Sequence, residues 1–451
     1  MRALLLTGAA LLLAGCASTS PEQASSAIAR EVEARTGATP RLMRAGDPAI
    51  ARATDALLAT PLSMENALHV ALLNHPGLQA TFWEAGIAQA ELAQATRLSN
   101  PAFGFARLAG GGERELERSV GFDLAGLLTM PLRRRMETRR VEQTRLTVAA
   151  AIEAHLLATR KAWVEAVAAQ QGLAYARQVS ASTEAAAELM DRMARAGNAS
   201  SLDLAREQAL HAEAGAAVLR AARDATHAHE ALTRQLGLWG AQAGYALPER
   251  LPELPAAPLA LTRIEQAALE RRLDVQAARL GAEHLAADLG LTRSTRLVNV
   301  LELGWQDKRE SGAPRASGYE VSLELPLFDW GGARVARAES AYMQSLHRVA
   351  DMAIKARSEA REAYLGYRAN YDLARHYRDE VIPLRKKIAD ETLLRYNGML
   401  ASPFALLQDA RDQAQAVSSY IEALKDFWLA DAALAGALGG KPAAEHKEHQ
   451  Q

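Results

Sequence analysis

No proline occurs between Pro131 and Pro248, and this proline-free stretch restricts the possible folds more than any other feature of the sequence. Proline inside a helix removes a hydrogen bond and clashes with the preceding turn, so its absence permits uninterrupted helices. Alanine, the strongest helix former, makes up more than a fifth of the 451 residues, and aromatic residues make up only 5%. We expect a helix from Leu132 to about Arg195, with about 64 residues and a length of about 95 Å. Helices of this length are rare in ordinary globular domains.

The second half of the chain predicts another long helix, from Arg334 to Lys387. Small and apolar residues recur there at alternating spacings of three and four, the pattern of a closely packed coiled-coil seam. Its members, one of them polar, are Leu346, Val349, Ala353, Ala356, Ala360, Ala363, Tyr367, Asn370, Ala374, Tyr377, Val381 and Leu384. We expect Pro383 to bend this helix near its end. Gly197 and Gly398 lie where the long helices must reverse direction.

Four short segments alternate apolar and polar residues with a period of two, which indicates strands with one apolar and one polar face. Two precede the first long helix, near 100–109 and 117–126, and two precede the second, near 297–307 and 317–327. The connecting segments 109–117 and 308–317 are rich in glycine and charge. We therefore expect each pair of strands to form a hairpin.

The two halves of the sequence form an internal repeat. Leu62, Ala71, Leu72, Gln79 and Ala80 match Leu259, Ala268, Leu269, Gln276 and Ala277 at a constant offset of 197. Each copy has the order helix, strand, strand, long helix, turn, long helix, so the predicted fold class is mainly α with membrane β-strands. The predicted segments are a signal peptide (1–15), an extended strap with one short helix near 24–35 (16–61), the first repeat (62–237), a linker (238–258), the second repeat (259–438) and a charged tail (439–451).

The N-terminus has the layout of a secretory signal, with Arg2 before an apolar run and small residues after it. Residues 13–16, Leu-Ala-Gly-Cys, resemble the bacterial lipoprotein signal, in which the cysteine becomes the acylated first residue of the mature protein. Cys16 is the only cysteine of the chain, and it lies where this motif requires it. We therefore expect lipidation at Cys16, and several acyl chains together anchor a protein firmly. The alternative is an ordinary cleaved signal with an incidental cysteine.

Composition and motifs disfavour several classes of function. The 52 basic and 53 acidic side chains nearly balance, which argues against a nucleic-acid binder. The sequence contains no HExxH, P-loop, GxSxG or dinucleotide fingerprint, so we expect neither an enzyme nor a cofactor. Two histidine pairs are weak metal candidates: His227 and His229 point to different faces of a predicted helix, and His446 and His449 lie in the charged tail.

No segment after the N-terminus approaches the roughly 20 apolar residues of a membrane-spanning helix, so any crossing of a membrane must use strands. Strands of about ten residues are long enough when tilted, but four strands cannot close a barrel. An open sheet edge in lipid leaves backbone groups unpaired at a cost of several kcal/mol each. Several copies must therefore share one barrel, and the long helices would continue it as a hollow bundle.

The chain resembles the TolC-type outer-membrane efflux channels over essentially all of its mature sequence. The resemblance rests on the internal duplication, the hairpin in each repeat, segment 325–332 (Leu-Pro-Leu-Phe-Asp-Trp-Gly-Gly) and the second helix turn at 398–411. It implies a homotrimer with a twelve-stranded barrel and a periplasmic α-helical tunnel. It also implies docking onto a periplasmic membrane-fusion adaptor and an inner-membrane pump of the RND type. In the first repeat, Met-Pro-Leu-Arg-Arg-Arg at 130–135 replaces the usual Gly-Gly start of the helix, which leaves that strand-to-helix junction open.

The resemblance implies a gate as well, because acidic side chains at the second helix turn ring the lumen in this family and attract cations. Asp409 matches the later of two gate acids if the turn carries two additional residues, and Asp412 is the neighbouring option. Arg395 and Tyr396 are candidate closing partners. The alternative is that both aspartates are solvated charges on a helix surface.

Two further sets of residues follow from the same resemblance. Gly197 with Ser200, and Gly398 with Ser402, would contact the adaptor at the helix tips, although simple helix capping would explain the same residues. An aromatic belt at the lipid boundary is expected from Trp305, Tyr319, Phe328 and Trp330.

The predicted function is the outer-membrane channel of a tripartite efflux system for drugs or metal ions. The alternatives are a lipid-anchored periplasmic coiled-coil scaffold without a pore and a type I protein-secretion channel. The alternating strands argue against the scaffold, and the lipidated start argues against protein secretion. The sequence does not identify the cargo, because specificity in such systems resides mainly in the inner-membrane partner.

Overall fold

The computed structural model describes residues 21–36, 47–111, 113–297, 300–324 and 326–440. The chain divides into two compact units, which are treated separately below. The first unit comprises residues 1–28, 81–149 and 273–354, and the second comprises 29–80, 150–272 and 355–451. None of the helices in the described ranges combines the length and the hydropathy needed to cross a lipid bilayer.

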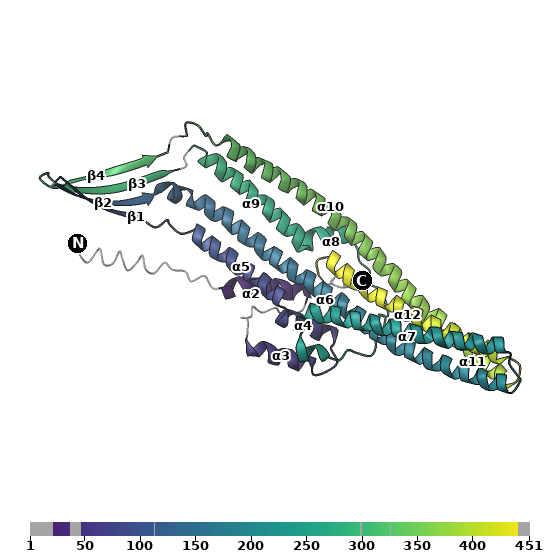
Figure 1. Ribbon diagram of the computed structural model, residues 1–451. Coiled ribbons are helices and arrows are strands. Elements are labelled where there is room, and N and C mark those ends of the chain that lie inside the picture. The colour runs from purple at the N-terminus through teal and green to yellow at the C-terminus, as the bar shows by residue number, and fades with distance from the viewer. Residues whose placement is uncertain (1–20, 37–46, 112, 298–299, 325, 441–451) are drawn as a thin grey trace, which may run out of the picture. The chain divides into compact units, whose positions relative to one another are not determined.

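The first unit contains one antiparallel sheet of four strands in chain order (Figure 1). Its strands are β1 (Ala102–Gly110), β2 (Glu113–Asp123), β3 (Leu301–Glu310) and β4 (Ala316–Leu323). Two hairpins therefore join through β2 and β3, and the edges of the sheet are β1 and β4.

The predicted loop at 109–117 is wrong, because residues 113–117 belong to β2. On β3, Glu117 lies opposite Lys308, whereas Glu115 lies opposite Glu310. Glu115 forms an ion pair with Lys308. Opposite charges on neighbouring strands stabilise the pairing. The fourth strand ends at Leu323, earlier than the predicted 327, and Pro326 follows without an N–H for the ladder.

Helices make up most of the remaining chain. They are α2 (Pro21–Thr36), α3 (Pro48–Leu58), α4 (Met64–Asn74), α5 (Pro76–Ala95), α6 (Leu124–Arg195), α7 (Ser201–Leu236), the 3-10 turn η1 (Gly240–Gly244), α8 (Ile264–Arg271), α9 (Leu273–Thr295), α10 (Gly332–His376), the π turn η2 (Tyr377–Val381), α11 (Ile382–Asn397) and α12 (Pro403–Ala437). In the first unit, α9 runs beside the first part of α10 (Figure 1).

The strap predicted at 16–61 contains two helices in its described part, where one was expected. The second of these, α3, begins at Pro48, and the Asp47 carboxylate caps it by accepting from the Ala49 N–H at 2.8 Å. Proline suits the first turn of a helix, because its fixed φ is helical and its missing N–H would have had no partner there. Pro48 therefore begins a helix within the strap.

The first long helix begins at Leu124, eight residues before the predicted start, and it contains Pro131 in its interior. β2 passes into α6 without a loop, and the Asp123 carboxylate accepts from the Gly126 N–H at 2.7 Å to cap the first turn. The second long helix is also different from the prediction, since the π turn η2 separates α10 from α11. Pro383 lies in the first turn of α11.

The core of the second unit packs parts of both repeats around Tyr367, Tyr371 and Phe427. Trp163 of α6 donates its indole N–H to the Leu62 carbonyl at 2.7 Å, and the Tyr371 hydroxyl donates to the Ala256 carbonyl at 3.0 Å. The predicted seam is buried only in its middle, at Ala356, Ala360, Tyr367 and Ala374, whereas Leu346 and Leu384 are exposed.

Candidate functional site

The sheet has two chemically different faces. The register places apolar side chains of all four strands on one face: Phe103, Val120, Phe122, Leu301, Leu303, Trp305, Tyr319, Val321 and Leu323. Most of them are exposed to solvent. The opposite face carries small and polar residues such as Ser119, Gln306, Glu320, Glu117 and Lys308. Such a sheet suits a position with lipid on one side and water on the other.

The four expected belt residues are all exposed large side chains. Trp305 and Tyr319 are direct cross-strand partners in the sheet. Phe328 and Trp330 lie between β4 and α10, and Phe328 is fully exposed. The Asp329 carboxylate turns the chain there by accepting from the Gly331 N–H at 2.8 Å.

The first helix tip follows the capping interpretation. Gly197 adopts φ of +77°, and the Asn198 N–H donates to the Met193 carbonyl at 2.8 Å to close the end of α6. Ser200 caps α7 in a reciprocal capping box with Asp203.

The second helix tip differs at its glycine. Gly398 has φ of −83°, and the left-handed conformation falls on Met399, with φ of +61°. A left-handed residue with a side chain costs about 1–2 kcal/mol, so this tip is strained where the first is not. Ser402 caps α12 by accepting from the Ala405 N–H at 3.2 Å. Met399 and Leu400 are almost fully exposed at this tip.

The expected gate acids join the two helices of one hairpin. The Asp409 carboxylate of α12 accepts from the Thr392 hydroxyl of α11 at 2.5 Å. Asp412 forms an ion pair with Arg385 of α11 at 2.8 Å. Within one copy, and among the described residues, their partners are not Arg395 or Tyr396.

Arg395 is engaged within its own helix, because its Nε lies 3.0 Å from Glu391 Oε1 one turn earlier. Tyr396 is half-buried near the end of α11. The structure thus brings Asp409 and Asp412 close to α11, and it places neither of the two expected closing partners against them.

A stronger connection was missed from the sequence. Arg411 of α12 donates to both carboxylate oxygens of Glu207 in α7, at 2.5 and 2.6 Å, and so connects the α6–α7 hairpin with the α11–α12 hairpin. The Glu207 side chain is only 6% exposed. A buried carboxylate requires such a partner, and removing one member of a buried pair is strongly destabilising. The sequence contained no local signal for this pair, because its two members are 204 positions apart.

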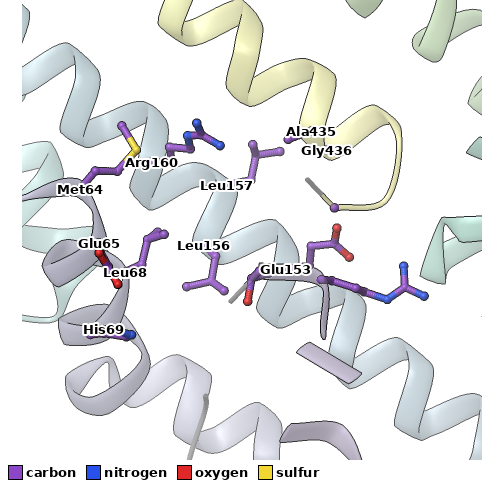
Figure 2. Close-up of a pocket in the computed structure, with 13 residues that line it drawn as sticks. Met64, Glu65, Leu68, His69, Glu153, Leu156, Leu157, Arg160, Ala435 and Gly436 are labelled. Carbon is purple, nitrogen blue, oxygen red and sulfur yellow. The ribbon is translucent and has the colours of Figure 1, made fainter. Parts of the chain in front are cut away.

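A cavity of about 440 Å³ lies in the second unit, lined by residues of α4, α6 and the end of α12. Figure 2 shows side chains of α4 and α6 facing one another across it, with Glu65 and Leu68 on one side and Leu156 and Arg160 on the other. Arg160 is held by Asp431 at 2.7 Å.

Two histidine contacts occur in the second unit. His229 stacks on Tyr245 with 4.4 Å between the ring centroids. Burial raises the pKa of Tyr245 to about 12. His75 and His155 lie 4.2 Å apart, centroid to centroid. Across the described ranges, no group of three or more His, Cys, Asp or Glu side chains could hold a metal ion. Cys16, His446 and His449 lie outside the described residues.

No protein-family model and no curated protein matches the sequence. Solved structures do match it. The outer-membrane channel CmeC of Campylobacter jejuni aligns with a TM-score of 0.71 and 15% identity, over 85% of this chain and 87% of that one. The outer-membrane protein VceC of Vibrio cholerae gives 0.70 and 16%, over 84% and 96%. The open state of the MtrE outer-membrane channel of Neisseria gonorrhoeae gives 0.69 and 17%, over 84% and 89%.

The fold is that of the TolC-type outer-membrane channels. The resemblance predicted from the sequence is therefore confirmed at the level of the fold.

Proposed function

We propose that the chain is one subunit of an outer-membrane channel, in which three copies close a twelve-stranded barrel. The observation that carries this proposal is the four-stranded sheet with one apolar face, one polar face and two outer strands, β1 and β4. A sheet edge exposed to lipid is costly, and pairing β4 of one copy with β1 of the next removes it. The likeness to solved outer-membrane channels supports the same arrangement.

In this proposal the helices of three copies continue the barrel as a periplasmic tunnel. The tips at Gly197 with Ser200 and at Gly398 with Ser402 contact a periplasmic membrane-fusion adaptor, which joins the channel to an inner-membrane pump of the RND type. Cys16 carries the lipid anchor, and the aromatic belt of Trp305, Tyr319, Phe328 and Trp330 lies at the boundary of the outer-membrane lipid. Drugs or metal ions pass through, and no cofactor is needed.

The closed state of the tunnel depends, in this proposal, on contacts near the helix tips. Glu207 and Arg411 hold two hairpins of one copy together, while Asp409 and Asp412 hold α11 to α12. Opening the tunnel requires the hairpins to move apart, so the Glu207–Arg411 pair opposes opening. In this proposal Arg395 and Tyr396 contact a neighbouring copy.

The test uses the full-length protein from outer-membrane fractions, in planar bilayers. Wild-type protein is expected as an SDS-resistant, heat-modifiable trimer with low conductance at low voltage. Glu207→Gln and Asp409→Ala are expected to raise that conductance, with the larger rise for Glu207→Gln because it releases two hairpins. Glu213→Gln, an exposed glutamate of the same helix, is the matched control and should leave conductance unchanged.

Three results would each contradict a different part of the proposal. A protein that is monomeric and water-soluble without detergent would exclude the channel and favour the scaffold without a pore. If the trimer conducts and its conductance is the same in wild type and in both variants, the channel proposal stands and these residues are excluded from its gate. Export of a protein in place of small molecules by cells carrying the channel would favour the type I secretion alternative.

A further inference from the structure

The start of α6 carries a motif that the channel fold does not explain, Met-Pro-Leu-Arg-Arg-Arg at 130–135. An open hollow of about 650 Å³ lies beside it in the first unit. Its lining includes Met130, Pro131, Thr138 and three arginines, Arg134, Arg135 and Arg139. Among the described residues, no acidic side chain lines this hollow. The hollow is therefore both basic and partly apolar.

Two of these three arginines have no partner within the part of the chain that the structure describes. Arg139 forms an ion pair with Glu283 of α9. The neighbours of the motif are also engaged, since Arg133 donates to the Thr129 hydroxyl and Arg140 pairs with Glu91 at 2.8 Å.

In contrast, the guanidinium groups of Arg134 and Arg135 are exposed and make no ion pair or hydrogen bond with any described residue. Free guanidinium groups side by side bind phosphate well, because each presents several donors in a planar fork.

The order of side chains along α6 is that of a membrane interface. α6 begins where β2 ends, and Leu127 and Leu128 in its first turn are 45% and 70% exposed. Pro131, Arg134 and Thr138 follow Leu127 at helical spacing on the same face. Arg134 lies about 10 Å further along the axis, at 1.5 Å per residue. Apolar side chains next to the sheet and arginines beyond them match hydrocarbon followed by headgroup phosphates.

The second repeat has no pair of adjacent arginines at the start of its long helix. After β4, the corresponding arginine, Arg334, donates to the backbone carbonyl of Arg296 at 3.3 Å. Exposed aromatic side chains, Phe328 and Trp330, occupy this junction instead. The free arginine pair is thus particular to the first repeat.

We infer that the hollow at 130–139 binds the phosphate group of an anionic phospholipid, with Arg134 and Arg135 on the phosphate and Leu127 and Leu128 against an acyl chain. This inference depends on the proposed location of the sheet in a membrane. The bound lipid would fix the depth at which the first-repeat hairpin enters the bilayer.

The experiment measures binding of phosphatidylglycerol and phosphatidylcholine to the assembled, full-length protein in detergent by native mass spectrometry. Arg134→Gln combined with Arg135→Gln should bind phosphatidylglycerol about 25-fold more weakly, about fivefold per arginine, while phosphatidylcholine binding stays the same. The matched control, Arg192→Gln with Arg220→Gln, removes two exposed arginines of the second unit and should bind both lipids as wild type does. Arg134→Lys with Arg135→Lys keeps the charge and should retain most of the binding.

Unchanged phosphatidylglycerol affinity in the glutamine variant would overturn the inference. Full competition by inorganic phosphate would also overturn it, because the site would then bind a free anion. Conductance of the same samples separates this inference from the proposed function. If the wild type conducts and the glutamine variant binds phosphatidylglycerol unchanged, the channel is kept and the lipid site is rejected. If the wild type never conducts but the glutamine variant loses lipid binding as expected, the lipid site is kept and the channel is rejected.

Discussion

The two repeats build the same backbone junction with different electrostatics. In the first repeat, His75 ends α4 with its N–H on the Ala71 carbonyl, and in the second, Arg272 ends α8 with its N–H on the Ala268 carbonyl. A glycine at the end of the last helix of each repeat packs against that junction, Gly237 in the first and Gly439 in the second, and both have φ of +68°.

The side chains that face the long helix differ between the junctions. His75 lies against His155 of α6, whereas Arg272 donates to Glu359 of α10 at 2.5 Å. Backbone shape was therefore retained between the repeats, while a neutral ring pair occupies one junction and an ion pair occupies the other. We expect the first junction to respond to pH and the second to salt.

The largest expected effect tests the shared backbone. Alanine at Gly237 or Gly439 would have to adopt a left-handed φ, and its Cβ would come within 2.8 Å of backbone atoms of His75 or Arg271. Each substitution should lower the free energy of unfolding by about 3 kcal/mol, measured by urea denaturation. Gly172→Ala and Gly366→Ala, in open positions of the long helices, are the controls and should raise stability by about 0.5–1 kcal/mol. If only one of the junction glycines is sensitive, the equivalence of the junctions is wrong.

A smaller effect is expected from the ion pair of the second junction. The Glu359 side chain is about half exposed, so Glu359→Gln should cost only about 0.5–1 kcal/mol in unfolding free energy. Most of that difference should disappear in concentrated salt, which screens the pair. Glu362→Gln, an exposed neighbour on α10, provides the control. A cost that persists at high salt would show that packing, and not charge, maintains this junction.

The third effect belongs to the first junction. Burial lowers the pKa of His75 below its usual 6.5, and the neighbouring His155 lowers it further. Burial also lowers the pKa of His155, although its hydrogen bond to the Gln235 carbonyl acts in the opposite direction. A lowered pKa favours the neutral ring in the folded state. The stabilisation is therefore complete above pH 6.5 and is lost as the pH falls through the folded-state pKa values.

The measurement is the urea midpoint of wild type and His155→Gln as a function of pH. Wild type should lose stability below pH 6.5, and the variant should lose less over the same range. A variant with the full wild-type pH dependence would assign the response to other groups, and the contrast between the junctions would fail.

Much of the fold could be predicted because it follows from local chemistry. The absence of proline between Pro131 and Pro248 predicted the long helices, and the period of two around Trp305 and Tyr319 predicted the strands. The errors came from prolines and charges whose effect depends on context. Pro48 begins a helix and Pro131 lies inside one. Residues 113–117 extend a strand in which Lys308 lies opposite Glu117 and forms an ion pair with Glu115.

The candidate site was less accessible from the sequence. Ser200 and Ser402 have the capping geometry that their position suggested. The Glu207–Arg411 pair joins residues 204 positions apart, so no local pattern predicts it. Asp409 and Asp412 were found by resemblance, but their partners depend on how α11 and α12 pack.

The π turn at Tyr377–Val381 places one additional residue in an otherwise regular helix. Each residue of an α-helix turns by about 100°, so this insertion rotates the faces of α11 relative to those of α10. The seam of small residues is buried at Ala374, before the turn, and exposed at Leu384, after it, although the spacing in the sequence runs through both. Loss of one residue from this five-residue turn would keep every helix but would present a different side of α11 to α12. The length of the turn therefore sets which face of α11 packs against α12, and sequence composition does not record that length.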